Sequence, residues 1–176
     1  MTHPYDVTHH VITVLVEDKP GVLARISSMF ARRGFNIHSL AVGPTADPRL
    51  SRMTVVVDGP EMEQIIKQLY KLVHTVKVTE HRPGDAVERE IMLVRINADS
   101  KRRSEILDSA GIFDARAVDV GKSTITFELS GDPGRLADFL ELMKPYGIVD
   151  MVKSGRIALA RDPKSKNGRQ PELRSA

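Results

Sequence analysis

The sequence predicts an α+β protein made of two ferredoxin-like βαββαβ units in tandem. Short apolar runs rich in β-branched residues alternate with stretches whose apolar residues recur every three to four positions, which indicates strands alternating with helices. The order β-α-β-β-α-β occurs twice, and this order is the ferredoxin-like arrangement. Residues 82–85 (RPGD) separate the two cycles, so we expect domains at 1–81 and 90–161 joined by a linker at 82–89.

The first unit opens with a strand, a tight loop and an amphipathic helix. Residues 11–16 are an apolar run of strand length, and residues 17–21 (EDKPG) interrupt it with turn-forming residues. The spacing then becomes that of a helix, which ends near Gly34, a residue suited to the left-handed position after a helix. The remaining elements expected in this unit are strands at 36–42 and 53–57, a helix at 61–72 and a strand at 73–81.

The second unit repeats this order. Asp99 or Ser100 can cap its first helix, which runs to Ala110 and stops at Gly111. The other expected elements are strands at 91–96, 113–120, 123–129 and 148–152, a helix at 132–144 and an added edge strand at 156–160. Each unit is small for independent stability, so we expect dimerisation through sheet edges or helix faces to support the fold.

The net charge of +3 belongs to the end of the chain. Residues 161–176 contain five Lys or Arg and two Asp or Glu, which accounts for the whole net charge and leaves residues 1–160 neutral. This weakens a nucleic-acid-binding function, which usually needs a basic face on a folded domain. Residues 162–176 are almost free of apolar side chains, so we expect a disordered basic tail there.

Composition also limits the class of protein. The chain has no Cys, which excludes disulfides, thiolate metal sites and catalytic cysteines. No apolar run approaches the roughly 20 residues that a membrane helix needs. The N-terminus lacks the basic and apolar regions of a secretory signal. We therefore expect a cytoplasmic protein that does not bind membranes.

The sequence contains no recognisable catalytic or metal-binding constellation. The GxGxxG, GxxxxGK[ST] and GxSxG motifs are absent. The neighbours His9 and His10 point to opposite faces of any strand, which is poor geometry for joint metal ligation. We accordingly predict no catalytic residue and no metal site.

The loop before the first helix is the candidate binding site. Free N–H groups in the first turn, residues 21–23, can receive a carboxylate, and the Asp18 carboxylate and Asn36 amide oxygen can accept from an ammonium. These groups together suit a zwitterionic amino acid. An apolar pocket for its side chain could be lined by Val22, Ile37 and Leu40. An ordinary β-α turn before a capped helix explains the same spacing, so both interpretations stay open here.

A resemblance to a known family supports the binding interpretation. Residues 14–57 read VLVEDKPGVLARISSMFARRGFNIHSLAVGPTADPRLSRMTVVV, within which RRGFNI and SRMTVVV are the most specific segments. This stretch resembles the ACT domain that opens the small, regulatory subunit of acetolactate synthase (acetohydroxyacid synthase). The similarity continues through QIIKQLYKLVHTVKVTE and REIMLVRI, and covers roughly residues 9–160.

The resemblance implies a subunit without activity of its own. It would activate a large, thiamine-diphosphate-dependent catalytic subunit of branched-chain amino-acid synthesis and confer feedback inhibition, usually by valine. Thiamine diphosphate, magnesium and FAD are expected on that catalytic partner, with no cofactor on this chain. Two ACT domains would pair side by side as a homodimer with the effector between them. The implied effector-binding residues are Asp18, Lys19, Pro20, Gly21, Val22 and Leu23 of one chain with Asn36 and Ile37 of the other.

Two positions depart from the family pattern. Asp18 stands where many members carry Asn, and its extra negative charge would attract an ammonium and repel a misplaced carboxylate. His38 stands where an acidic residue is common. The alternative function is a free-standing ACT-type amino-acid sensor that regulates another protein, whereas an enzyme would need a clustered polar pocket.

Overall fold

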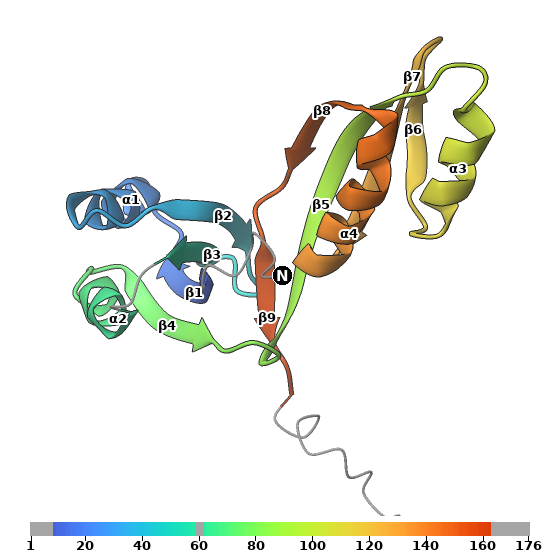
Figure 1. Cartoon of the computed structure of the whole chain (residues 1–176). Coiled ribbons are helices and arrows are strands. Elements are labelled where there is room, and N and C mark those ends of the chain that lie inside the picture. Colours follow the sequence, from blue (N-terminus) through green and yellow to red (C-terminus); the bar gives the residue numbers. More distant parts are fainter. Residues whose placement is uncertain (1–8, 59–61, 163–176) are drawn as a thin grey trace, which may run out of the picture.

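The first domain is a four-stranded antiparallel sheet with two helices on one face (Figure 1). The chain is described by a computed structural model over residues 9–58 and 62–162. The elements of this domain are β1 (His9–Glu17), α1 (Val22–Arg32), β2 (Ile37–Pro44), β3 (Leu50–Asp58), α2 (Met62–Tyr70) and β4 (Thr75–His81). The strands lie in the order β2-β3-β1-β4, which confirms the ferredoxin-like arrangement.

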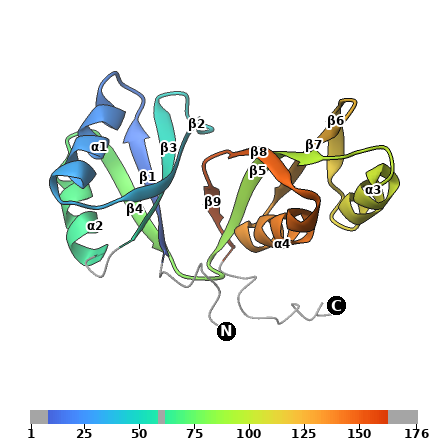
Figure 2. The same ribbon diagram turned by 45° about the horizontal axis from the view of Figure 1, so that its top comes forward.

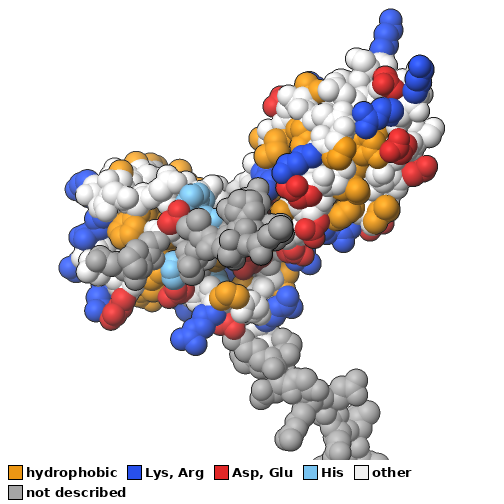
Figure 3. All heavy atoms as spheres, viewed as in Figure 1, with side chains coloured by type: hydrophobic (Ala, Val, Ile, Leu, Met, Phe, Trp, Pro, Cys, Tyr) orange, Lys and Arg blue, Asp and Glu red, His pale blue; other side chains and the backbone are white. Residues whose placement is uncertain are grey.

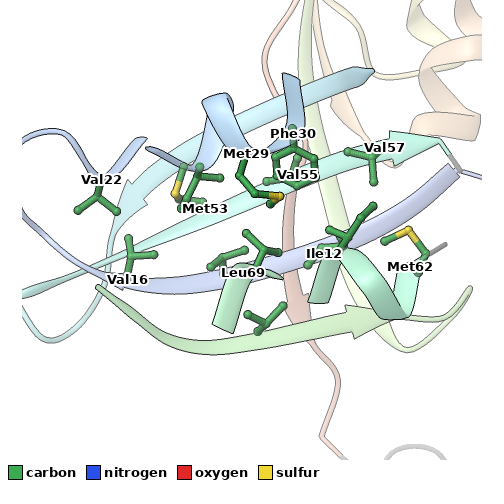
Figure 4. Packing of buried hydrophobic residues seen from close by; sticks show 14 residues of the cluster. Ile12, Val16, Val22, Met29, Phe30, Met53, Val55, Val57, Met62 and Leu69 are labelled. Atoms are coloured by element: carbon green, nitrogen blue, oxygen red, sulfur yellow. The ribbon is translucent and has the colours of Figure 1, made fainter. Parts of the chain in front are cut away.

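The core of this domain lies between the sheet and the two helices (Figure 4). Alternate residues of β1, including Ile12 and Val16, point toward the helices because side chains alternate across a strand. The helix α1 buries Met29 and Phe30 against them, and α2 adds residues such as Leu69. The apolar spacing seen in the sequence therefore places α1 and fixes where its N-terminal turn meets the sheet.

The second domain repeats this architecture with one extra strand. Its elements are β5 (Ala86–Asn97), α3 (Arg103–Gly111), β6 (Arg116–Val120), β7 (Thr124–Gly131), α4 (Pro133–Met143), the 3-10 turn η1 (Lys144–Tyr146), β8 (Ile148–Lys153) and β9 (Ile157–Ala160). The strand order is β6-β7-β5-β8, and β9 pairs with the beginning of β5. Figure 2 shows α4 packed along this sheet, apart from α1 and α2 of the first domain.

Several predicted boundaries are wrong. The linker expected at 82–89 is shorter, because Ala86 and the three residues after it pair with β9 as the first part of β5. The helix α3 begins at Arg103, since the Asp99 carboxylate caps a separate turn before the helix. After Gly111 the chain makes a turn through Asp114, whose φ is 51°, so β6 starts at Arg116.

The helix α2 is also shorter than predicted. It ends at Tyr70, and turn hydrogen bonds from Lys71 and Leu72 follow it, so β4 begins at Thr75. Val73 is 83% exposed and contributes to neither element. The left-handed conformation expected at Gly34 is confirmed by its φ of 71°.

The two domains meet where β9 and the start of β5 cross the open face of the first sheet (Figure 1). A small apolar cluster fills this seam: Val11, Val56, Ala86 and Ala158. The backbone N–H of Arg156 donates to Ser39 at 2.7 Å, and its guanidinium donates to Glu90 at 2.8 Å and Glu88 at 3.0 Å. The seam therefore combines apolar contact with a largely buried ion-pair network.

Within the described ranges, no helix has the length and apolarity needed to cross a bilayer. The basic tail predicted at 162–176 lies outside the described residues from 163 onward.

Candidate functional site

The loop between β1 and α1 exposes the start of a helix. Gly21 is the residue before α1 and has a φ of 83°, a left-handed conformation that glycine adopts without strain. No side chain of the described residues caps this helix. Within the turn the Val22 N–H makes a long hydrogen bond of 3.4 Å to the Lys19 carbonyl, and the Lys19 N–H donates to the Glu17 carbonyl at 3.0 Å. The partial positive charge of the α1 N-terminus is thus available to an anion.

The sheet brings a second turn against this loop. Glu17 at the end of β1 pairs with Leu50 at the start of β3, so the loop meets the β2–β3 turn. The Asp18 N–H donates to the Arg49 carbonyl at 2.8 Å and ties the two segments together. Between them lies a solvent-open hollow of about 640 Å³. Its lining residues are Glu17, Asp18, Lys19, Asp47, Pro48, Arg49, Leu50 and Val76.

Most charges around the hollow are already paired. The Arg49 guanidinium donates to the Asp47 carboxylate at 2.7 and 3.0 Å, and these hydrogen bonds lower the pKa of Asp47 to about 2. Hydrogen bonds from Lys19 and then His74 lower the pKa of Glu17. The Asp18 carboxylate, in contrast, has no side-chain partner within the described part of the chain and is exposed. It remains free to bind a cation.

The predicted site residues fall into two groups. The backbone of residues 18–23 forms one continuous loop, in which Leu23 is 45% exposed. Asn36 and Ile37 lie at the other end of the sheet, because Ile37 pairs with Val57 while the loop adjoins the start of β3. One chain therefore does not bring the two groups together.

The apolar pocket considered in the sequence analysis does not form within one chain. Val22 is 7% exposed and packs in the core, so it can offer a ligand only its backbone. Ile37 and Leu40 pack against the same core. Apolar side chains with helical or alternating spacing pack in the core, which explains why they line no pocket within one chain; a pocket between two chains stays a prediction.

Sequence reasoning missed Asp47, Arg49 and Val76, which line the hollow from the β2–β3 turn and β4. A usable signal was present. In the predicted topology the first and third strands are antiparallel neighbours, so the turn that precedes the third strand must lie beside the loop that follows the first.

Comparison with known proteins covers both domains. The family described as AHAS small subunit-like ACT domain matches residues 12–77, and the family described as small subunit of acetolactate synthase matches residues 89–162. The acetolactate synthase small subunit of Mycolicibacterium smegmatis is 46% identical over 158 residues, covering 88% of this chain and 92% of the relative. A probable acetolactate synthase small subunit of Archaeoglobus fulgidus is 48% identical over 157 residues, covering 88% and 98%.

A solved structure agrees with these sequence matches. The crystal structure of the acetolactate synthase small subunit from Thermotoga maritima has a TM-score of 0.79 and 36% sequence identity to this chain. It covers 88% of this chain and 98% of its own. The likeness therefore spans both domains and their connection.

Proposed function

We propose a regulatory function for this chain, which belongs to the family of acetolactate synthase small subunits. Its partner is the large, catalytic subunit of acetolactate synthase. In this proposal the chain has no activity of its own, activates that subunit in the cytoplasm and makes it sensitive to a branched-chain amino acid, with valine as the expected effector. Thiamine diphosphate, magnesium and FAD are assigned to the catalytic partner.

The uncapped start of α1 is the observation that carries the effector proposal. An amino-acid carboxylate would accept hydrogen bonds from the first-turn N–H groups, which no side chain caps within residues 9–58 and 62–162. Its ammonium would lie near the free Asp18 carboxylate, and its aliphatic side chain near the exposed part of Leu23. A zwitterion fits this pattern better than a simple anion, because Asp18 would repel an anion that offers no positive group.

Homodimerisation would complete the site. The strand β2 is at the edge of the first sheet, and its end at Pro44 lies near the β1–α1 loop because Pro44 pairs with Ser51, next to Leu50. If two β2 strands lie antiparallel across a two-fold axis, the start of one is next to the end of the other. Asn36 and Ile37 of one chain would then face the β1–α1 loop of its partner.

Regulation would follow from differential binding. An effector that binds more tightly to one conformation of the complex shifts the population toward that conformation, and the catalytic subunit responds. No chemical step on this chain is required.

Reconstitution with a purified catalytic subunit tests the proposal. We expect the chain to raise acetolactate formation severalfold and valine to reverse the increase. Calorimetry on the chain alone should report valine binding. A free-standing sensor would instead bind an amino acid and leave the catalytic subunit unchanged, and absence of both effects would refute the proposal.

A further inference from the structure

Three metal-ligating side chains meet at the end of the first sheet opposite the β1–α1 loop. The Nδ1 of His9 is 2.5 Å from one carboxylate oxygen of Asp58, and the Nε2 of His38 contacts the other. One ligand atom from each of these residues lies within 4.8 Å of the other two. The two imidazole rings are 4.6 Å apart between centroids.

The strand register explains why these residues meet. His9 on β1 is directly opposite Asp58 on β3. The pairing of β2 with β3 shifts between Ile37 and Ser39, so His38 is the extra residue of a β-bulge. Bulges change the direction of a side chain, and this one brings His38 to Asp58. Each residue thus comes from a different strand.

The ligand set is chemically suited to a divalent transition ion. Two imidazole nitrogens and one carboxylate oxygen are ligands that Zn²⁺ binds, with water able to fill a fourth position. Tetrahedral bonds of about 2.0–2.1 Å separate ligand atoms by roughly 3.3 Å, so the present spacing needs only small rotations. The three side chains are 25–35% exposed, which leaves a path for the ion.

Binding would replace the existing hydrogen bonds. At present both histidines can donate to the Asp58 carboxylate. A neutral imidazole can move its hydrogen to the other ring nitrogen and present a lone pair to the metal. The ion would then join the ends of β1, β2 and β3, next to Asn36, whose amide nitrogen is 3.5 Å from the His38 ring.

We propose that His9, His38 and Asp58 form a binding site for one divalent transition-metal ion of the zinc class. This revises the prediction of no metal site, which considered only the neighbours His9 and His10. Figure 3 shows histidine surface beside carboxylate surface on the first domain.

The other described histidines provide internal controls. His10 contacts Glu80 at 2.9 Å, His74 contacts Glu17 at 3.0 Å, and His81 contacts Thr13 at 2.9 Å. Among the described residues, none of these histidines belongs to a group of three ligating side chains. If Zn²⁺ only bound weakly to individual surface histidines, replacing His10 or His38 would change its affinity to the same extent.

The test is a Zn²⁺ titration of the tag-free full chain against a chromophoric chelator, without the catalytic subunit. We expect one Zn²⁺ per chain. Loss of one of three protein ligands should weaken binding at least about tenfold in His38→Ala and in Asp58→Asn. His10→Ala should stay within about twofold of the wild type.

Two further measurements separate a built site from adventitious binding. Zn²⁺ should raise the melting temperature of the wild type and of His10→Ala, because a ligand that binds the native state stabilises it, but not that of His38→Ala. Co²⁺ should give the visible spectrum of a four-coordinate site. If Asp58→Asn does not fold, His38→Gln gives the same comparison. No binding, or binding unaffected by changing His9 and His38, would overturn the proposal.

Discussion

The loops that join the first strand to the first helix differ between the two domains in the partners of their backbone N–H groups. In the second domain the loop between β5 and α3 is closed by its own side chains: the Asp99 carboxylate accepts from the N–H groups of Lys101 and Arg102, both at 2.9 Å. The Arg103 guanidinium also donates to the carbonyls of Ala98, Gly121 and Lys122. Neither α1 nor α3 has a side-chain cap on its own first residue, but in the β1–α1 loop no side chain of the described residues accepts from the loop N–H groups either.

This difference shows how one fold can serve two purposes. Free N–H groups in the loop before a helix need a partner, which is either a side chain of the same chain or a group from outside. Where Asp99 supplies the carboxylate, the loop is structurally complete. Where Gly21 stands before α1, no side chain of the described residues accepts from these N–H groups, and we propose that an effector carboxylate does so instead.

The largest expected effect is that of Gly21→Asp. A non-glycine residue at a φ of 83° is strained, and an added carboxylate would compete with the effector at the start of α1. We expect valine inhibition to disappear while activation of the catalytic subunit is largely retained. The measurement is the valine concentration that halves acetolactate formation by the reconstituted enzyme.

Gly34→Asp is the matched control for this change. Gly34 has a φ of 71° and, like Gly21, open space around an added Cβ, but it follows the opposite end of α1. It should lower stability at least as much, because a carboxylate is also unfavourable at a helix C-terminus, and leave valine inhibition intact. If Gly21→Asp lost activation of the catalytic subunit together with valine inhibition, the two functions would not be separable in this chain.

A second change tests the ammonium partner. Removing the free carboxylate in Asp18→Ala should weaken valine binding about tenfold or more, because hydrogen bonds to charged groups contribute roughly 1.5–3 kcal/mol. The valine affinity of Asp18→Asn should lie between those of Asp18→Ala and the wild type. Calorimetry on the isolated chain measures both, and unchanged affinity in Asp18→Ala would remove this residue from the site.

Breaking the closed loop should affect stability alone. Asp99→Ala leaves the Lys101 and Arg102 N–H groups without their acceptor, and losing a hydrogen bond of this kind costs about 1 kcal/mol. Chemical denaturation should report this loss, while the valine concentration for half inhibition stays the same. A change in valine response would mean that the second loop also takes part in effector binding.

The smallest expected effect concerns the turn beside the open loop. Hydrogen bonds from Arg49 hold the pKa of Asp47 at about 2, so the stabilisation from this pair is present above the unfolded value near 3.8 and is lost as pH falls toward 2. In Arg49→Ala the pKa should return toward its usual value, which an NMR titration of the Asp47 carboxyl can follow. If the Asp47 carboxyl still titrated near 2 in Arg49→Ala, a group other than Arg49 would be responsible for its lowered pKa.

Most of the fold, but only part of the candidate site, could be predicted from the sequence. Local spacing predicted each strand and helix of the two cycles, and Gly34 ended α1 as its chemistry requires. The seam could not be predicted, because Arg156 meets Ser39 from a position 117 residues away. Asp99 was correctly predicted to accept hydrogen bonds from backbone N–H groups, but these groups belong to the turn before α3 and not to the helix itself.

The site followed the same division. The turn-forming residues EDKPG predicted the β1–α1 loop, whereas the position of Arg49 beside it depends on strand pairing. The His9, His38 and Asp58 cluster depends on a one-residue register shift in β2, and the local sequence pattern does not predict this shift. Contacts set by register are therefore where sequence reasoning stopped.

The strand β5 has a mechanical consequence for the whole molecule. Its first residues pair with β9 over the first sheet, and its later residues form the centre of the second sheet, in one unbroken run of 12 residues. Such a strand is about 40 Å long. Because the same strand packs over the first sheet and is paired in the second, we expect a tilt of the first sheet to be transmitted as a larger displacement of the end of β5 that leads to α3.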